Sequence, residues 1–391
     1  MLKRVTLFRF FGFDIKADGS WLFLSVLICW TLATTIFPPM HPGKSMDVYY
    51  LMSLATLVGI FVSIIAHEVA HAIIAEYYHM PISSITLFIF GGVAEMKGDP
   101  SHPRGEFLMA MAGPAMSALM GLLFYAASDM YIYYVQAAPG QAPALSLLLH
   151  YLGDLNLLIA AFNMIPAFPL DGGRALRAII WHYKNNLVLA TRVVSLTGFA
   201  LAYGLIGYAC YMLAIYNDML TGIWSGLLGL FVHGTAAYSV RHIENRSILS
   251  AQTVRDFMDT DTQDVSPDIN LATLIDNYAY KYYQKRFPVT EGKTIVGVIS
   301  LKNVMALDRN KWQWLHVSSV MEPIGEHAVI DPDASAAEAL DAMQRHGVDA
   351  LFVAQNRQLQ GVISLKDIAH YLSISMKVDQ NMSVSSGKKA Y

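Results

Sequence analysis

Long apolar segments in the first 240 or so residues constrain the fold more than any other feature of the sequence. From Trp21 to Ala75 the only Lys, Arg, Asp or Glu residues are Lys44, Asp47 and Glu68. Crossing the hydrocarbon core of a bilayer takes about 20 mostly apolar residues. The sequence therefore predicts a polytopic α-helical membrane domain with six spans. They are expected near 20–38, 50–75, 106–128, 145–166, 187–215 and 220–238.

The positions of Lys and Arg predict how the spans are oriented, because positively charged connections stay in the cytoplasm. The connections predicted on one side hold Lys3, Arg4, Arg9, Lys16, Lys97, Arg104, Arg174, Arg177, Lys184, Arg241 and Arg246, and the other side has Lys44 alone. We expect a multi-pass protein of the cell (inner or plasma) membrane with both termini in the cytoplasm. The connections 39–49, 129–144 and 216–219 then face the other way.

Between the second and third spans, residues 83–96 are rich in β-branched and aromatic side chains and contain the pair Gly91-Gly92. This pattern predicts two strands joined by a tight turn. Unpaired strand edges are not tolerated against lipid, so this small membrane-associated β-hairpin should lie within protein or in a wet cavity. Its free edge could accept an extended substrate.

The second span contains His67-Glu68-Val69-Ala70-His71. Residues four apart lie on one face of a helix, so both imidazoles can bind one metal ion. Glu68 would lie beside that ion, where it can take a proton from a water molecule. Zinc is the usual metal for such ligands. Ionisable residues are costly inside a membrane, which makes an accidental match of this motif in a span much less probable than a functional one.

A third ligand is expected from the segment Asn163 to Arg174, which interrupts the fourth span with two prolines and a Gly pair. Proline breaks a helix, and a break at membrane depth is tolerated where it lines a cavity. Asp171 lies at this break and is the best candidate. Asn163 could give its amide to a substrate carbonyl group or a developing oxyanion.

Together these motifs resemble the site-2 protease family of intramembrane metalloproteases. The family pattern pairs H-E-x-x-H on one span with N-x-x-P-x-x-x-L-D-G on a later one, and this chain matches both over roughly residues 1–240. The resemblance implies one Zn²⁺ per chain, bound by His67, His71 and Asp171. It also implies Glu68 as the general base and Asn163 as a substrate-orienting or oxyanion group.

The reaction implied is hydrolysis of a peptide bond in or near the transmembrane segment of a membrane-protein substrate, as in regulated intramembrane proteolysis. The partners expected from this part of the chain are that substrate and membrane lipid.

The last third of the chain contains an internal repeat, because Gly297–Asn303 is matched 64 positions later by Gly361–Asp367. Each copy predicts a short strand, a helix, two strands and a helix, which together form a soluble tandem α/β pair. The expected organisation is a membrane-embedded metalloprotease domain at 1–245, repeats at 250–310 and 314–376, and a disordered tail at 377–391.

The two repeats resemble a pair of CBS domains, and many such pairs bind adenine nucleotides between their halves. The resemblance implies ATP or AMP as a ligand, with Ser364 and Asp367 contacting ribose and phosphate. Ser300 and Asn303 occupy the equivalent positions of the first copy, where Asn replaces Asp. Other pairs serve only for dimerisation, so a homodimer through the CBS domains is the alternative.

Other classes of function fit less well. A net charge of −3, without a basic stripe interleaved with aromatic residues, argues against nucleic acid as a partner. The two cysteines, Cys29 and Cys210, lie in apolar segments and indicate packing. A CBS-gated metal-ion transporter or channel is the main rival hypothesis, although it would need no general base beside its ligands. An inactive relative is disfavoured because no active-site residue is missing.

Overall fold

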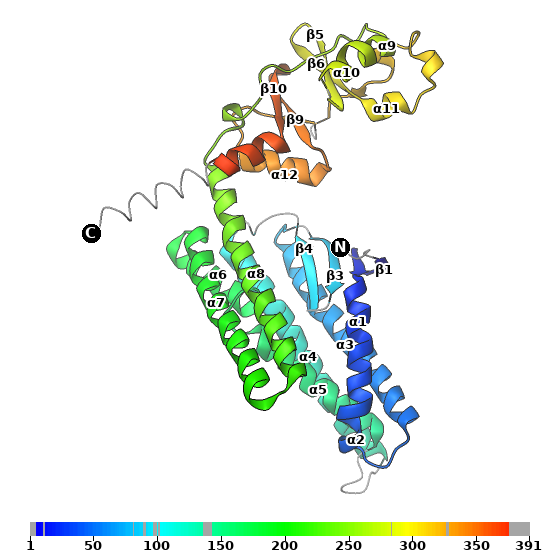
Figure 1. The fold of residues 1–391 in the computed structure, drawn as a ribbon, viewed down its shortest axis with the longest axis vertical. Coiled ribbons are helices and arrows are strands. Elements are labelled where there is room, and N and C mark those ends of the chain that lie inside the picture. Colours follow the sequence, from blue (N-terminus) through cyan, green and yellow to red (C-terminus); the bar gives the residue numbers. More distant parts are fainter. Residues whose placement is uncertain are drawn as a thin grey trace, which may run out of the picture. The chain divides into compact units, whose positions relative to one another are not determined.

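The computed structural model describes residues 5–10, 12–80, 82–88, 91–96, 100, 102–135, 143–282, 284–325 and 328–374. The chain divides into two compact units, Met1–Ile243 and Glu244–Tyr391. Figure 1 shows the elements of each unit. The tail predicted at 377–391 lies outside the described residues.

The first unit contains the six predicted spans, each of which is a helix long and apolar enough to cross a membrane. The first span comprises α1 (Gly19–Thr31), a turn of π-helix η1 (Leu32–Ile36) and α2 (Phe37–Met40). The next three are α3 (Met46–Tyr77), α4 (Pro103–Val135) and α5 (Ala144–Asn163). The last two are α7 (Leu187–Tyr211), with η2 (Met212–Tyr216) at its end, and α8 (Met219–Ser250).

Polar side chains within these helices bond to their own backbone. Ser53, Thr56 and Ser63 of α3 each donate a hydroxyl hydrogen bond to the carbonyl oxygen four residues earlier. Small residues also let helices pack closely. A Cβ atom on Gly153 of α5 would lie only 2.9 Å from the Tyr125 ring of α4. These three hydroxyl groups of α3 are therefore satisfied within their own helix, and Gly153 leaves room for the neighbouring helix α4.

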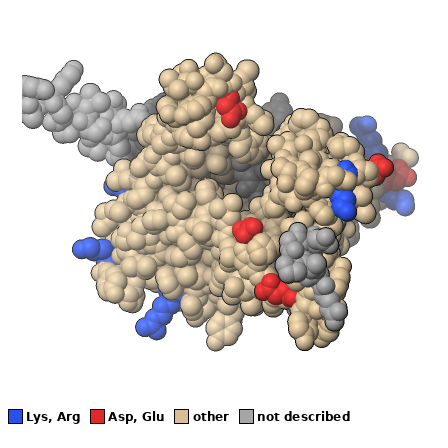
Figure 2. Space-filling model, turned by 90° about the horizontal axis from the view of Figure 1, so that it is seen from below, with Lys and Arg blue, Asp and Glu red and all other residues tan. Residues whose placement is uncertain are grey.

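One end of the first unit has few charged side chains. Helix α2 and the turn between α7 and α8 lie at this end (Figure 1). Figure 2 looks onto this end and shows a face with few Lys, Arg, Asp or Glu side chains. Within the described residues this agrees with the sequence, because the connections 39–49 and 216–219 contain Lys44 as their single basic residue.

The predicted hairpin is present but belongs to a larger sheet. Strands β3 (Ile82–Phe88) and β4 (Gly91–Met96) pair antiparallel, as expected for residues 83–96. The sheet continues through β2 (Phe13–Ala17) to β1 (Val5–Phe10), in the order β1-β2-β3-β4. These two strands were not predicted from the sequence. They pair antiparallel with each other, with Phe10 opposite Phe13, and β2 pairs with β3 in parallel across about 70 residues.

This sheet packs against the helix that holds the H-E-x-x-H motif. Phe13 and Ile15 of β2 and Ile85 of β3 form one buried cluster with Ile65 and Val69 of α3. The two α3 residues flank His67 and Glu68 in the sequence. The sheet is therefore anchored beside the candidate site.

The second unit contains the repeat. Its main sheet has the order β5-β6-β10-β9-β8, with β7 also paired to β6. The strands are β5 (Arg286–Glu291), β6 (Thr294–Ser300), β7 (Glu322–Pro323), β8 (Val329–Ile330), β9 (Ala350–Gln355) and β10 (Gln358–Ser364). The helices include η3 (Val254–Asp256), α9 (Leu271–Thr273), η4 (Leu274–Ala279), α10 (Tyr280–Tyr282), α11 (Leu301–Met305), η5 (Arg309–Lys311), η6 (Val317–Ser319), α12 (Ala336–His346) and 365–374.

The two repeats are interlocked at their beginnings. The amide of Val254 donates to Ala334 O at 2.8 Å, and the amide of Val317 donates to Ile269 O at 2.9 Å. The segment that starts each repeat therefore bonds to the other repeat. This exchange makes the pair one folding unit with two buried cores, around Val353 and Val289.

Candidate metal centre

The H-E-x-x-H motif lies in α3 with all three of its polar residues buried. His67, Glu68 and His71 are 6%, 8% and 4% exposed. The four-residue spacing places the two imidazole rings next to each other on one helix face, with centroids 4.8 Å apart. The structure therefore arranges these side chains as the spacing predicts.

Asp171 is the first residue of a separate helix, α6 (Asp171–Lys184). Helix α5 ends at Asn163, and the loop 164–170 with its two prolines folds back over the first turn of α6. A Cβ atom on Gly173 would lie 2.6 Å from the carbonyl carbon of Ala167, so the Gly pair permits this close approach. Phe168 anchors the loop by packing against Val194 and Ala236.

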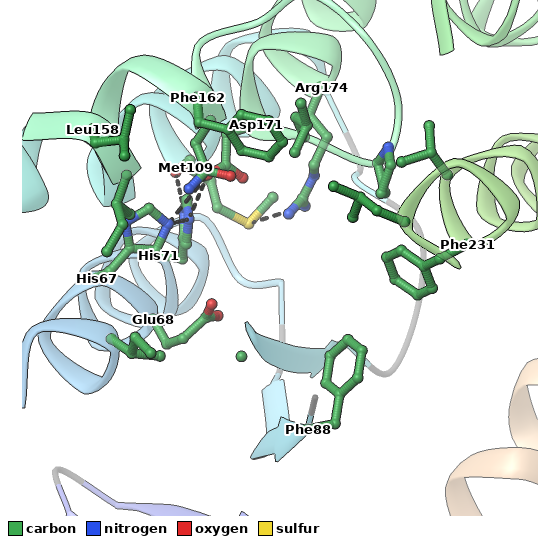
Figure 3. Close-up of a pocket in the computed structure, with 18 of the residues that line it drawn as sticks. His67, Glu68, His71, Phe88, Met109, Leu158, Phe162, Asp171, Arg174 and Phe231 are labelled. Atoms are coloured by element: carbon green, nitrogen blue, oxygen red, sulfur yellow. Dashed lines mark hydrogen bonds and ion pairs between the residues drawn. The ribbon is translucent and has the colours of Figure 1, made fainter. Parts of the chain in front are cut away.

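These elements bring three donor atoms together, as Figure 3 shows. His67 Nε2 and His71 Nε2 each lie 3.2 Å from Asp171 Oδ2, and the two nitrogens are 3.1 Å apart. Within the described residues, His67, His71 and Asp171 are the three-residue group whose ligand atoms are close enough to share a metal ion.

The outer nitrogen of each ring is held by α4. His71 Nδ1 donates to the backbone carbonyl oxygen of Met109 at 2.6 Å, and His67 Nδ1 lies 2.8 Å from Ser117 Oγ. A carbonyl oxygen can only accept, so in a neutral His71 ring Nε2 carries the lone pair that faces the centre. Such partners fix the orientation and tautomer of metal-binding histidines.

This donor set fits a tetrahedral metal ion. Zinc–nitrogen bonds of about 2.0–2.1 Å put neighbouring ligand atoms about 3.3 Å apart, close to the spacings found here. Gly113 of α4 adds to the fit, because a Cβ atom there would lie 2.6 Å from His67 Nε2. The backbone of α4 can therefore approach the centre without filling it.

The three residues open onto a cavity of about 640 Å³. Glu68 and Asn163 also line it, so the cavity is shared by all five residues predicted from the two motifs. Gly92 of β4 packs on Glu68, because a Cβ atom at Gly92 would lie 2.6 Å from Glu68 Cγ. Strand β4 therefore borders the cavity next to the Glu68 side chain.

A buried ion pair fastens α4 to α6. Arg177 Nε donates to Glu106 Oε1 at 2.7 Å, and Glu106 is fully buried. The Arg177 guanidinium also lies over the Phe168 ring, 5.1 Å from its centroid. Arg177 was predicted only as a cytoplasmic charge, and Glu106, Ser117 and Met109 were not predicted from the sequence. The sequence contains no local signal that would have marked them.

In the second unit, the predicted nucleotide-binding residues have partners within the protein. Ser364 Oγ donates to Asp367 Oδ2 at 2.6 Å, and the Asp367 amide donates back to Ser364 Oγ at 3.3 Å. This pair caps the helix at 365–374. In the first copy, Asn303 donates to Glu322 Oε1 at 2.7 Å, and Ser300 is the N-cap of α11.

Comparisons with known proteins agree with both halves of this description. The model of peptidase family M50 matches residues 55–139 and 130–205, and the CBS domain model matches 254–310 and 317–374. A zinc metalloprotease of Methanocaldococcus jannaschii is 29% identical over 371 residues, which cover 95% of this chain and 96% of the relative.

Further relatives carry similar names. Rip3 of Mycobacterium tuberculosis, whose name describes it as a zinc metalloprotease, is 26% identical over 96% of this chain and 94% of its own length. A solved structure, the site-2 protease from Methanocaldococcus jannaschii, is 29% identical, covers 61% of this chain and 95% of its own, and has a TM-score of 0.42.

The membrane unit thus matches a peptidase family in the region that contains His67, His71 and Asp171. The relatives are named as metalloproteases, which does not favour the transporter hypothesis. Residues 55–205 of the membrane unit are thus similar to peptidase family M50, and the chain is a multi-pass zinc metalloprotease that carries a C-terminal pair of CBS domains.

Proposed function

We propose that this chain hydrolyses a peptide bond in or near the transmembrane segment of a membrane-protein substrate, as a step of regulated intramembrane proteolysis. The observation that carries the proposal is the meeting of three buried metal-binding side chains with Glu68 in one cavity among apolar helices. A site among membrane spans is accessible to a substrate segment that lies in the membrane, and this favours a membrane-protein substrate over a soluble one.

His67, His71 and Asp171 would hold the zinc ion through the two Nε2 atoms and Oδ2. When bound there, zinc supplies a Lewis acid that polarises a carbonyl group and makes a water molecule acidic enough to ionise near neutral pH. Ser117 and Met109 keep the two imidazole rings turned toward the centre. Asp171 compensates part of the ion's charge in a surrounding that excludes water.

Glu68 acts as the general base in this proposal. Its carboxylate lies in the cavity and takes one proton from water as the water oxygen bonds to the scissile carbonyl carbon. The C–N bond then breaks with its electron pair on nitrogen, and Glu68 gives the proton to that nitrogen. Asn163 donates its amide N–H to the carbonyl oxygen while negative charge develops.

The sheet would present the substrate. A transmembrane helix must unwind before its backbone is open to attack, because helical hydrogen bonds occupy its carbonyl groups. β4 is the end strand of the sheet among the strands that the structure describes, and Gly92 of β4 touches Glu68. A substrate segment that adds to this edge as a further strand would pass beside the catalytic carboxylate.

We also propose that both termini face the cytoplasm, on the basis of the Lys and Arg residues described above. The CBS pair would then meet cytoplasmic ATP or AMP and regulate cleavage, with Ser364 and Asp367 as the main nucleotide contacts. Because these two side chains already cap a helix together, nucleotide binding would use a preformed pair. Association of two chains through the CBS domains is compatible with this proposal.

The role of Glu68 is tested by Glu68→Gln. Loss of a general base typically lowers the rate by about 10²–10⁴-fold, so we expect cleavage of a reconstituted single-span substrate to fall by that order. The bound zinc should stay near one ion per chain. Glu76→Gln, on an exposed turn of the same helix, is the matched control and should cleave normally. Unchanged cleavage by Glu68→Gln would rule out the mechanism.

The support given by α4 is tested by Ser117→Ala. Removing a hydrogen-bond partner of a metal-binding histidine costs about 10–100-fold in metal affinity, and we expect a loss of that size in zinc competition titrations. Ser128→Ala is the control, because Ser128 is also a buried hydroxyl on α4 but bonds to Ser146 O. Equal zinc affinity in both variants would show that the contact to His67 does not matter.

Nucleotide control is tested on the full chain in detergent with a fluorescent ATP analogue. We expect saturable binding that ATP or AMP displaces and that Asp367→Ala weakens by about tenfold or more, because a hydrogen bond to a charged group contributes about 1.5–3 kcal/mol. Asp276→Ala, at an exposed position in the first repeat, should bind as the unmodified chain does. Absence of binding at millimolar nucleotide would remove this part of the proposal.

A further inference from the structure

The cavity contains a permanent positive charge that neither zinc binding nor proton transfer uses. Arg174 follows Asp171 by three residues on α6, and residues at this spacing share a helix face. Both side chains line the cavity, and Figure 3 shows the Arg174 guanidinium next to the triad on the side toward Phe231.

Contacts with α4 place the guanidinium near the reacting groups. Arg174 Nη2 lies 3.7 Å from Met109 Sδ, and the carbonyl oxygen of the same Met109 accepts the hydrogen bond from His71. The charge of Arg174 also acts electrostatically on Glu68, His71 and Asp171. Arg174 is thus part of the same electrostatic environment as the metal-binding residues.

The rest of the cavity wall is mainly apolar. Among the lining residues that the structure describes, Arg174 is the one Lys or Arg side chain. The apolar members are Ile64, Ile82, Phe88, Met109, Leu158, Ile159, Phe162, Pro169, Leu170, Leu228, Phe231 and Val232. Charges attract more strongly where water is excluded, and the planar fork of Arg matches the two oxygens of a carboxylate.

The next arginine on α6 has a different role. Arg177 is bonded to the buried Glu106 and lies over Phe168, and it does not line the cavity. It holds α6 to α4. Of these two arginines of α6, Arg177 therefore holds the helix to α4, and Arg174 lines the cavity.

We infer that Arg174 binds the oxygen atoms of the scissile group as they gain negative charge and then holds the carboxylate of the new C-terminus. This inference rests on the proposed proteolysis. As water adds to the carbonyl carbon and the C–N bond breaks, the carbonyl oxygen and the water oxygen become the two oxygens of a carboxylic acid, and this acid gives the second proton of the water to the released amine and becomes an anionic carboxylate. Arg174 therefore binds the transition state and the product more tightly than the substrate, which lowers the barrier.

The first experiment measures product inhibition. Mass spectrometry of the fragments made by the zinc-loaded full chain in detergent identifies the bond that is cut. A short peptide that ends at this residue is then made with a free carboxylate and, as a control, with a C-terminal amide. The free acid should inhibit better than the amide, and in Arg174→Gln this advantage should shrink by about tenfold or more.

The second experiment separates binding from catalysis. In Arg174→Gln we expect kcat to fall by about 10²–10³-fold with KM nearly unchanged, as on removal of other groups that stabilise an oxyanion. Arg174→Lys keeps the charge without the fork and should be intermediate in both assays. Arg241→Gln is the matched control, because Arg241 is exposed on α8 and bonds only to Ala237 O among the contacts described.

Zinc content distinguishes the inference from a purely structural role. All Arg174 variants should retain about one zinc per chain. If Arg174→Gln lost its zinc, or kept the full preference for the free acid, the inference would be overturned. If the unmodified chain cut no substrate, the proposed function itself would fail, and that result would be seen before any Arg174 variant was made.

Discussion

Three buried lone-pair donors face one another in the membrane unit, and the arrangement of the helices around them depends on this contact. Two imidazole nitrogens and a carboxylate oxygen lie 3.1–3.2 Å apart with little access to water. Such groups are costly in a membrane unless a cation lies among them. A zinc ion bound by these three residues would meet that requirement. The need to bind a cation also explains the contacts from α4: Ser117 and the Met109 carbonyl oxygen bond to the two rings, and Gly113 leaves room for their Nε2 atoms.

The position of Asp171 is determined by the break between helices α5 and α6. The loop 164–170 leaves helical geometry where lipid cannot satisfy its backbone, so it must be covered by protein. The loop packs on α7 and α8 through Phe168, and the pair Glu106–Arg177 fastens α4 to α6, the helix that follows the loop. The Gly pair after Asp171 lets the loop lie directly on α6. A rigid break of this kind can present a carboxylate to a helix about 100 residues earlier in the chain.

Features carried by local sequence could be predicted, and features made by distant contacts could not. The six spans follow from apolar length, and the His67–His71 pair from helical spacing. Strands β1 and β2 were missed although they pair locally with each other, and no local pattern marks the pairing of Asp14 with Ser84 that joins them to the hairpin. Ser117 and the Met109 carbonyl were missed for the same reason. Arg174 and Arg177 were predicted only as cytoplasmic charges, whereas the structure gives one to the cavity and the other to a buried ion pair.

The central claim is that one zinc ion is held by His67, His71 and Asp171 inside the membrane unit. Zinc X-ray absorption spectroscopy on the purified full chain tests it most directly. The account predicts nitrogen and oxygen ligands at about 2.0–2.2 Å, with the outer-shell scattering of two imidazole rings. In His71→Ala any zinc that remains bound should show one ring fewer. Sulfur ligands, or a spectrum that His71→Ala and Asp171→Ala both leave unchanged, would contradict the account.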